Sequence, residues 1–95
     1  MTDPDHAAPA FRQASDVNFT SLSSGDAVLL HLKSLRYYTL NATGEALWLR
    51  LEEPQTVADL TLALTERYAV SARDARDSVE ALLRDLIRER LVVHA

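Results

Sequence analysis

The stretch from Leu35 to Trp48 constrains the fold more than any other part of the chain. Its first half, LRYYTL, is rich in aromatic residues and predicts a β-strand. From Asn41 onward the apolar residues recur at helical spacing. Asn41 and Thr43 can each cap a helix, because a short side-chain oxygen accepts from the unpaired amides of the first turn. The sequence therefore predicts a strand joined directly to a helix.

Two further strands are predicted upstream of this stretch. Residues 17–22 (VNFTSL) alternate weakly between apolar and polar, and SSGD follows them as a turn in which Gly25 can adopt positive φ. Residues 27–32 (AVLLHL) form a denser apolar run of strand length, which predicts the central strand.

The register of the hairpin between residues 27–32 and 35–40 has two solutions, because Lys33-Ser34 is a poor two-residue turn. With a two-residue loop, Val28, Leu30 and Leu32 share a face with Leu35, Tyr37 and Thr39. With a three-residue loop they share it instead with Arg36, Tyr38 and Leu40. We favour the second register because it gathers more apolar area on one face.

Three helices are predicted downstream. The first runs from Thr43 to about Leu51 and buries Leu47, Trp48 and Leu51 before Pro54 ends it. The second begins at Thr56, where TVAD matches a capping box with aspartate in place of glutamate. The side chains that this helix is expected to direct inward are Leu60, Ala63, Leu64 and Tyr68. The third and longest begins after Ser71 and extends to about Arg90, and residues 91–93 close the chain as a short extended segment.

The third helix carries two neighbouring stripes. The core stripe consists of Ala75, Val79, Leu82 and Leu86. The second stripe mixes charged and apolar side chains and consists of Arg76, Glu80, Leu83 and Ile87. One sequence does not separate a core position from a groove position, so both locations stay open for Leu83 and Ile87.

These elements predict an α+β fold, with a three-stranded antiparallel sheet followed by three helices in a winged-helix-like arrangement. The folded domain is expected to span residues 16–95. Residues 1–15 contain two prolines and no apolar period, which predicts a disordered tail.

Composition excludes several classes of function. The chain has no cysteine, and its histidines, His6, His31 and His94, have no spacing suited to a metal, so we expect neither a metal nor another cofactor. A net charge of −4 disfavours binding to phosphates or to anionic membranes. No serine or glycine motif predicts catalysis, and no apolar run is long enough to cross a bilayer. We therefore expect a cytoplasmic binding protein that is not an enzyme, and a monomer or weak dimer.

Helix-turn-helix DNA binding is the main alternative, because the last two helices follow each other after a short junction. The last helix carries five arginines, but five acidic residues offset them. A recognition helix without net positive charge is poorly suited to a DNA duplex.

The order of the motifs resembles the PqqD-like family, the small peptide-recognition domains of ribosomal peptide biosynthesis. The resemblance rests on residues 36–44 (RYYTLNATG) followed by ALW, on 56–60 (TVADL) and 68–70 (YAV), and on 82–86 (LLRDL) with Leu91-Val92. It covers roughly residues 17–93. The YYxLNxTG pattern with Trp48 is most similar to the lasso-peptide B1 type, in which a separate small chain works with a leader peptidase.

The resemblance implies that the leader region of a precursor peptide adds as a strand to the third strand and rests against the third helix. A free strand edge can bind an extended peptide in this way through its backbone groups. The implied peptide-binding residues are Leu35, Arg36, Tyr37, Tyr38, Thr39, Leu40, Arg76, Val79, Glu80, Leu83, Arg84 and Ile87. Arg76 and Arg84 would pair with acidic leader residues, and Leu83 and Ile87 would form an apolar pocket. The alternative within the family is a chaperone that works with a radical SAM enzyme in synthesis of the quinone cofactor PQQ.

Overall fold

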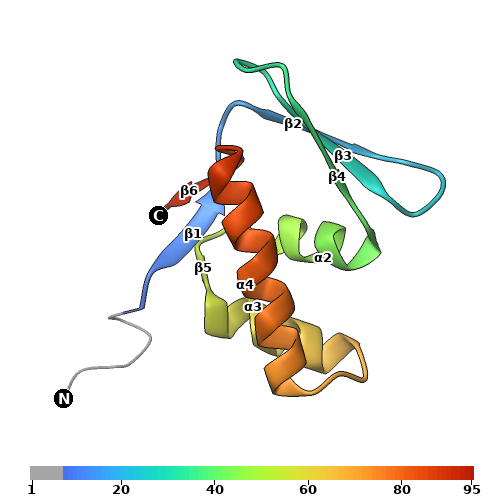
Figure 1. Cartoon of the computed structure of the whole chain (residues 1–95), viewed down its shortest axis with the longest axis vertical. Helices are drawn as coiled ribbons and strands as arrows, with labels where there is room; N and C mark the ends of the chain where they lie inside the picture. Colours follow the sequence, from blue (N-terminus) through green and yellow to red (C-terminus); the bar gives the residue numbers. More distant parts are fainter. Residues whose placement is uncertain (1–7) are drawn as a thin grey trace.

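The computed structural model describes residues 8–95 and contains two three-stranded antiparallel sheets and three helices (Figure 1). The elements in chain order are β1 (Ala10–Gln13), β2 (Val17–Ser21), β3 (Ala27–His31), β4 (Tyr37–Leu40), α2 (Ala42–Arg50), β5 (Gln55–Thr56), α3 (Val57–Arg67), α4 (Ala72–Arg88) and β6 (Val92–His94). The hairpin sheet has the order β2-β3-β4, and the small sheet has the order β5-β1-β6. The α+β class is confirmed, and the hairpin sheet β2-β3-β4 is the predicted three-stranded sheet that precedes the three helices. The small sheet was not predicted, because two of its strands, β5 and β6, are short segments that lie between and after the helices.

The favoured register of the β3–β4 hairpin is wrong. Leu29 pairs with Tyr38 and Leu30 pairs with Tyr37, which is the register of the two-residue loop. The buried face of the hairpin sheet therefore carries Ala27, Leu29 and Leu40 rather than Val28 and Leu30. The chain reaches this register through Leu35, whose φ of 59° lets the loop turn without glycine.

The buried face of β3 also carries a polar residue, His31. Its ring is buried, and its Nδ1 accepts hydrogen bonds from the backbone N–H groups of Lys33 and Ser34 at 3.2 and 3.3 Å. A buried polar group that has hydrogen-bond partners costs little. The polar residue at the end of β3 thus holds the hairpin loop while facing inward.

The small sheet includes residues that the sequence predicted to be a disordered tail. Ala10–Gln13 form β1, which pairs with β5 on one side and with β6 on the other. The expectation is wrong for these residues because Phe11 is 8% exposed and belongs to the core. Gln13 Nε2 also donates to the backbone oxygen of Trp48 at 2.7 Å. Residues 1–7 of the predicted tail, with His6, lie outside the described residues.

The strand-to-helix junction has the predicted form. Asn41 is the N-cap of α2, and its side chain accepts from the Gly44 N–H at 2.8 Å. A Cβ on Gly44 would lie 3.1 Å from Leu40 Cδ2, so the first turn of α2 approaches the end of β4 closely. Leu47, Trp48 and Leu51 are buried as predicted and anchor the helix in the core.

The last two helices form the other half of the core. The capping box of α3 is present, with Thr56 Oγ1 and the Asp59 side chain each accepting a hydrogen bond from the other's backbone N–H. Leu60 and Leu64 of α3 are buried, whereas Ala63 and Tyr68 are half-buried. Ser71 caps α4, which packs along α3 and ends at Arg88, near the predicted Arg90. Figure 1 shows α2 beneath the hairpin sheet, where it contacts both β4 and α3.

Candidate functional site

β4 is an edge strand with one free side. The backbone N–H of His31 donates to the Arg36 oxygen at 3.0 Å, which makes these two residues a hydrogen-bonded pair. Such pairs alternate along antiparallel strands, so Tyr38 and Leu40 bond to β3 in turn. The backbone groups of Tyr37 and Thr39 consequently point away from β3. In residues 8–95 no other strand pairs with this side.

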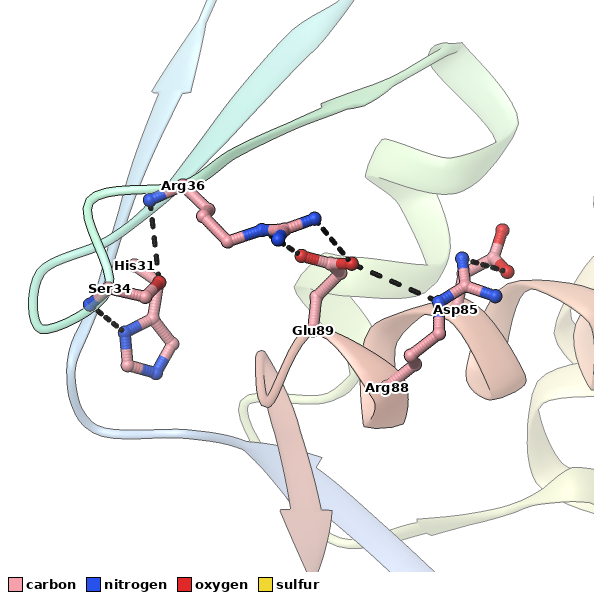
Figure 2. Close-up of polar contacts among 6 residues, drawn as sticks. All are labelled: His31, Ser34, Arg36, Asp85, Arg88 and Glu89. Atoms are coloured by element: carbon pink, nitrogen blue, oxygen red, sulfur yellow. Dashed lines mark hydrogen bonds and ion pairs between the residues drawn. The ribbon is translucent and has the colours of Figure 1, made fainter.

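Two long side chains connect β4 and its loop to α4. The Tyr38 hydroxyl donates to Asp85 Oδ2 at 3.0 Å. Burial of the ring and the hydrogen bond to Asp85 raise the pKa of Tyr38 above its ordinary value. One residue before β4, Arg36 Nε lies 2.8 Å from Glu89 Oε1 (Figure 2). Because Asp85 and Glu89 are one helical turn apart, one edge of α4 runs along the inner side of β4.

The stripe of α4 beside β4 differs from the predicted one. At about 3.6 residues per turn, Arg76, Glu80 and Ile87 lie on the far side of the helix from Asp85 and Glu89. Arg84 lies about a quarter turn from Asp85 and is exposed. Ile87 is 39% exposed. The structure therefore does not bring this predicted stripe together with β4.

Three of the predicted residues are in the core. Leu40, Val79 and Leu83 are buried, so Leu83 takes the core position, one of the two locations that the sequence left open for it. Of the rest, Leu35 lies in the loop, Tyr37 and Thr39 point to the outer face of the hairpin sheet, and Tyr38 is half-buried. Contact of these four residues with a peptide stays a prediction, and so does contact of the exposed residues of α4.

Sequence reasoning missed Asp85, Arg88 and Glu89 as site residues. Glu89 lies between two guanidinium groups, with Arg36 at 2.8 Å and Arg88 Nε at 3.9 Å, and Arg88 Nη2 also contacts Asp85 Oδ1 at 3.0 Å (Figure 2). The sequence did contain a signal for these contacts. Arg36 and Tyr38 are two residues apart and lie on one face of the strand, and Asp85 and Glu89 are four apart and lie on one face of the helix, so the two pairs have a similar separation in space.

Residues 8–95 contain no cluster of side chains suited to a metal ion. No three histidine, cysteine, aspartate or glutamate side chains lie close enough together in this range to hold a metal ion. Within the same range no helix is long and apolar enough to span a membrane. His94 contacts Phe11 with ring centroids 4.9 Å apart and an angle of 42° between the ring planes, and His31 holds the hairpin loop. The site is thus a strand edge beside a charged helix.

The family follows from a comparison with known proteins. Residues 26–92 match the profile of the family described as coenzyme PQQ synthesis protein D (PqqD). The chain belongs to the PqqD family. The matched range begins just before β3 and includes β4 and all of α4, so it contains both sides of the site. No sequence among the curated proteins matches this chain.

Two solved structures are similar to this PqqD-family chain over most of its length. One is TbiB1 in complex with the TbiA(β) leader peptide, with a TM-score of 0.76, 26% identity, and coverage of 85% of this chain and 93% of that chain. The other is a lasso peptide synthetase B1 complexed with the leader peptide, with a TM-score of 0.76, 29% identity, and coverage of 87% and 96%. Both of these proteins were solved with a leader peptide bound.

Proposed function

We propose that this PqqD-family protein binds the leader region of a ribosomally made precursor peptide and presents it to a processing enzyme. The observation that carries the proposal is the open edge of β4 in a chain whose structural relatives are B1 proteins in complex with leader peptides. The protein acts by binding, and the partner enzyme carries out the chemistry.

The backbone of the leader supplies most of the affinity in this mechanism. An extended peptide that adds to β4 hydrogen-bonds to the outward N–H and C=O groups of Tyr37 and Thr39. Because β4 belongs to an antiparallel sheet, an antiparallel peptide continues the same ladder. Main-chain pairing of this kind accepts many sequences, so specificity must come from the side chains around it.

The side chains of the leader alternate between two environments. Those on the inner side of the added strand face the edge of α4 that carries Asp85 and Glu89. Those on the outer side join the face that carries Tyr37, which is 71% exposed. The leader therefore gains a polar, charged contact on one side and an aromatic contact on the other.

A lasso-peptide leader peptidase is the proposed partner enzyme. The support is that one of the two relatives is a B1 component of a lasso peptide synthetase. The family description names PQQ synthesis. Neighbouring genes for a radical SAM enzyme and for a precursor that contains glutamate and tyrosine would indicate that pathway instead. The genes that neighbour this one distinguish the two partners.

The direct test is binding of two synthetic peptides, the leader and the core of the precursor encoded beside this gene. Fluorescence anisotropy with the purified chain should show saturable binding of the leader and none of the core. Incubation of the full precursor with the chain alone should leave it uncleaved, as mass spectrometry would show. If the core binds and the leader does not, or if no precursor is encoded nearby, the proposed function is wrong.

A further inference from the structure

A depression of about 900 Å³ lies at the end of the site where β4 begins. It is bounded by the β1–β2 connection, the β3–β4 loop and the C-terminal end of α4. Figure 2 shows this region, with the hairpin loop on one side and the last turn of α4 on the other. The charged residues that line it are Asp16, Lys33, Arg36, Arg88, Glu89 and Arg90. We call it the basic pocket.

The charge of the basic pocket is opposite to that of the chain. Its lining carries four cationic and two anionic side chains, whereas the whole chain has a net charge of −4. Lys33 pairs with Asp16 at 3.3 Å, and Arg36 and Arg88 share Glu89. Arg88 also pairs with Asp85 at 3.0 Å, just outside the pocket lining. Arg90 forms no ion pair within residues 8–95, so its charge is the one in the pocket that no described carboxylate neutralises.

Hydrogen-bond donors remain for a ligand. Glu89 and Asp85 together use only part of the Arg36 and Arg88 guanidinium groups, because each arginine has five N–H donors. His31 also lines the pocket. Since its Nδ1 accepts from two loop amides, its Nε2 carries the proton, and Figure 2 shows this second nitrogen on the side of the ring away from the loop. An anionic ligand with several acceptor oxygens suits this set of donors.

The position of the pocket identifies the source of the anion. Arg36 both lines the pocket and immediately precedes β4. A peptide that runs antiparallel to β4 pairs with Thr39, then with Tyr37, and next passes Arg36. At about 3.3 Å per residue, the residues that follow the paired segment reach the pocket within a few positions.

We propose that the basic pocket binds an aspartate or glutamate side chain that follows the β-paired segment of the leader peptide. This assignment rests on the proposed function and adds a specificity element to it. It also replaces Arg76 and Arg84, the sequence-based candidates for pairing with acidic leader residues, by Arg88 and Arg90. The backbone edge of β4 selects an extended chain, and the pocket favours the register that places an acidic residue beside it.

The test uses the full chain and the synthetic leader encoded beside its gene. Each acidic residue of the leader is replaced in turn by its amide, and affinities are measured by anisotropy for wild type and for Arg88→Gln and Arg90→Gln. One amide replacement, C-terminal to the paired segment, should weaken binding by about two- to fivefold, as expected for one largely exposed ion pair. That peptide should bind wild type and Arg90→Gln about equally. Arg73→Gln, an exposed arginine at the other end of α4, is the charge-matched control and should bind like wild type.

Two further measurements make the assignment sharper. Arg90→Glu should weaken binding of the natural leader, and a leader with lysine at the identified position should bind Arg90→Glu better than it binds wild type. Thermal melting of every variant excludes loss of the fold as the cause. Wild-type affinity should also fall more steeply with sodium chloride than that of the doubly substituted Arg88→Gln, Arg90→Gln protein.

Several results would overturn the assignment. If the leader binds wild type but no amide replacement weakens it, the pocket does not read the leader, while the proposed function stands. If inorganic phosphate shifts the NMR signals of pocket residues without weakening leader binding, the pocket is a site for free anions. If the leader does not bind wild type at all, the proposed function fails and the pocket assignment fails with it.

Discussion

The hydroxyl of Tyr38 donates to Asp85 across 47 residues of sequence, and this 3.0 Å hydrogen bond connects the edge strand to α4. Together with the Arg36–Glu89 ion pair it sets the separation between the two sides of the site. Substitution of Tyr38 therefore tests the contact between β4 and α4, because its ring is half-buried and its hydroxyl donates to a carboxylate of the helix.

Tyr38→Phe should cost about 0.5–1.5 kcal/mol of stability at pH 7, the usual contribution of one hydrogen bond. The cost should shrink in alkaline solution. The pKa of Tyr38 is raised above 10.0, so the hydroxyl stabilises the folded state fully below about pH 10, and this contribution is lost as the pH rises through the folded pKa. Melting temperatures of both proteins between pH 7 and 11 would measure it. A difference that grows above pH 10 would contradict the assignment of the proton.

Thr39→Pro and Tyr38→Pro should have opposite effects on fold and binding. The Thr39 N–H points away from β3, so its loss should change the melting temperature by no more than a few degrees and should weaken leader binding. Proline at residue 38 removes the N–H that bonds to Leu29 and also the hydroxyl bond to Asp85. That variant should lose at least ~1–3 kcal/mol and unfold the hairpin sheet.

Thr39→Ala is the control for the proline pair, because it keeps the amide and removes the side chain. It should bind leader nearly as well as wild type in the same anisotropy experiment. Leader binding by Thr39→Pro at wild-type affinity, in a chain that melts normally, would show that β4 is not the docking edge.

Trp48→Ala should destabilise the fold without touching the site. The indole is 2% exposed and belongs to the core cluster that joins α2 to the other elements. Truncation of a buried aromatic residue costs about 3–5 kcal/mol, a large share of the ~5–10 kcal/mol expected for a domain of this size. Urea denaturation should show this loss, and the exposed neighbour Leu49→Ala should change the free energy of unfolding by less than ~1 kcal/mol.

Phe11→Ala tests whether β1 belongs to the fold. Because Phe11 packs in the core and contacts His94, its truncation should also cost about 3–5 kcal/mol. Arg12→Ala, on the exposed face of the same strand, should be nearly neutral. Equal melting temperatures for Phe11→Ala and wild type would mean that residues 10–13 are dispensable for stability, as the sequence alone suggested.

Local sequence determined the elements whose signals are local. The change from strand to helix at Asn41, the capping box at Thr56 and the cap at Ser71 depend on hydrogen bonds within a few residues, and all three are present. The burial of Leu47, Trp48 and Leu51 follows from their helical spacing. The family was also evident from the sequence, because the order of the motifs indicated the PqqD-like family and the family match confirms it.

Tertiary contacts decided which face and which edge each element uses. The buried face of β3 includes His31, whose Nδ1 is satisfied there by two loop amides, and β1 is paired on both sides by β5 and β6. The edge of α4 beside β4 was decided by packing on α3, which places Val79 and Leu83 inside and turns Asp85 and Glu89 toward Tyr38 and Arg36. Periodicity shows that a helix has an apolar side, but which polar flank meets the strand depends on how the helix is rotated against its neighbours.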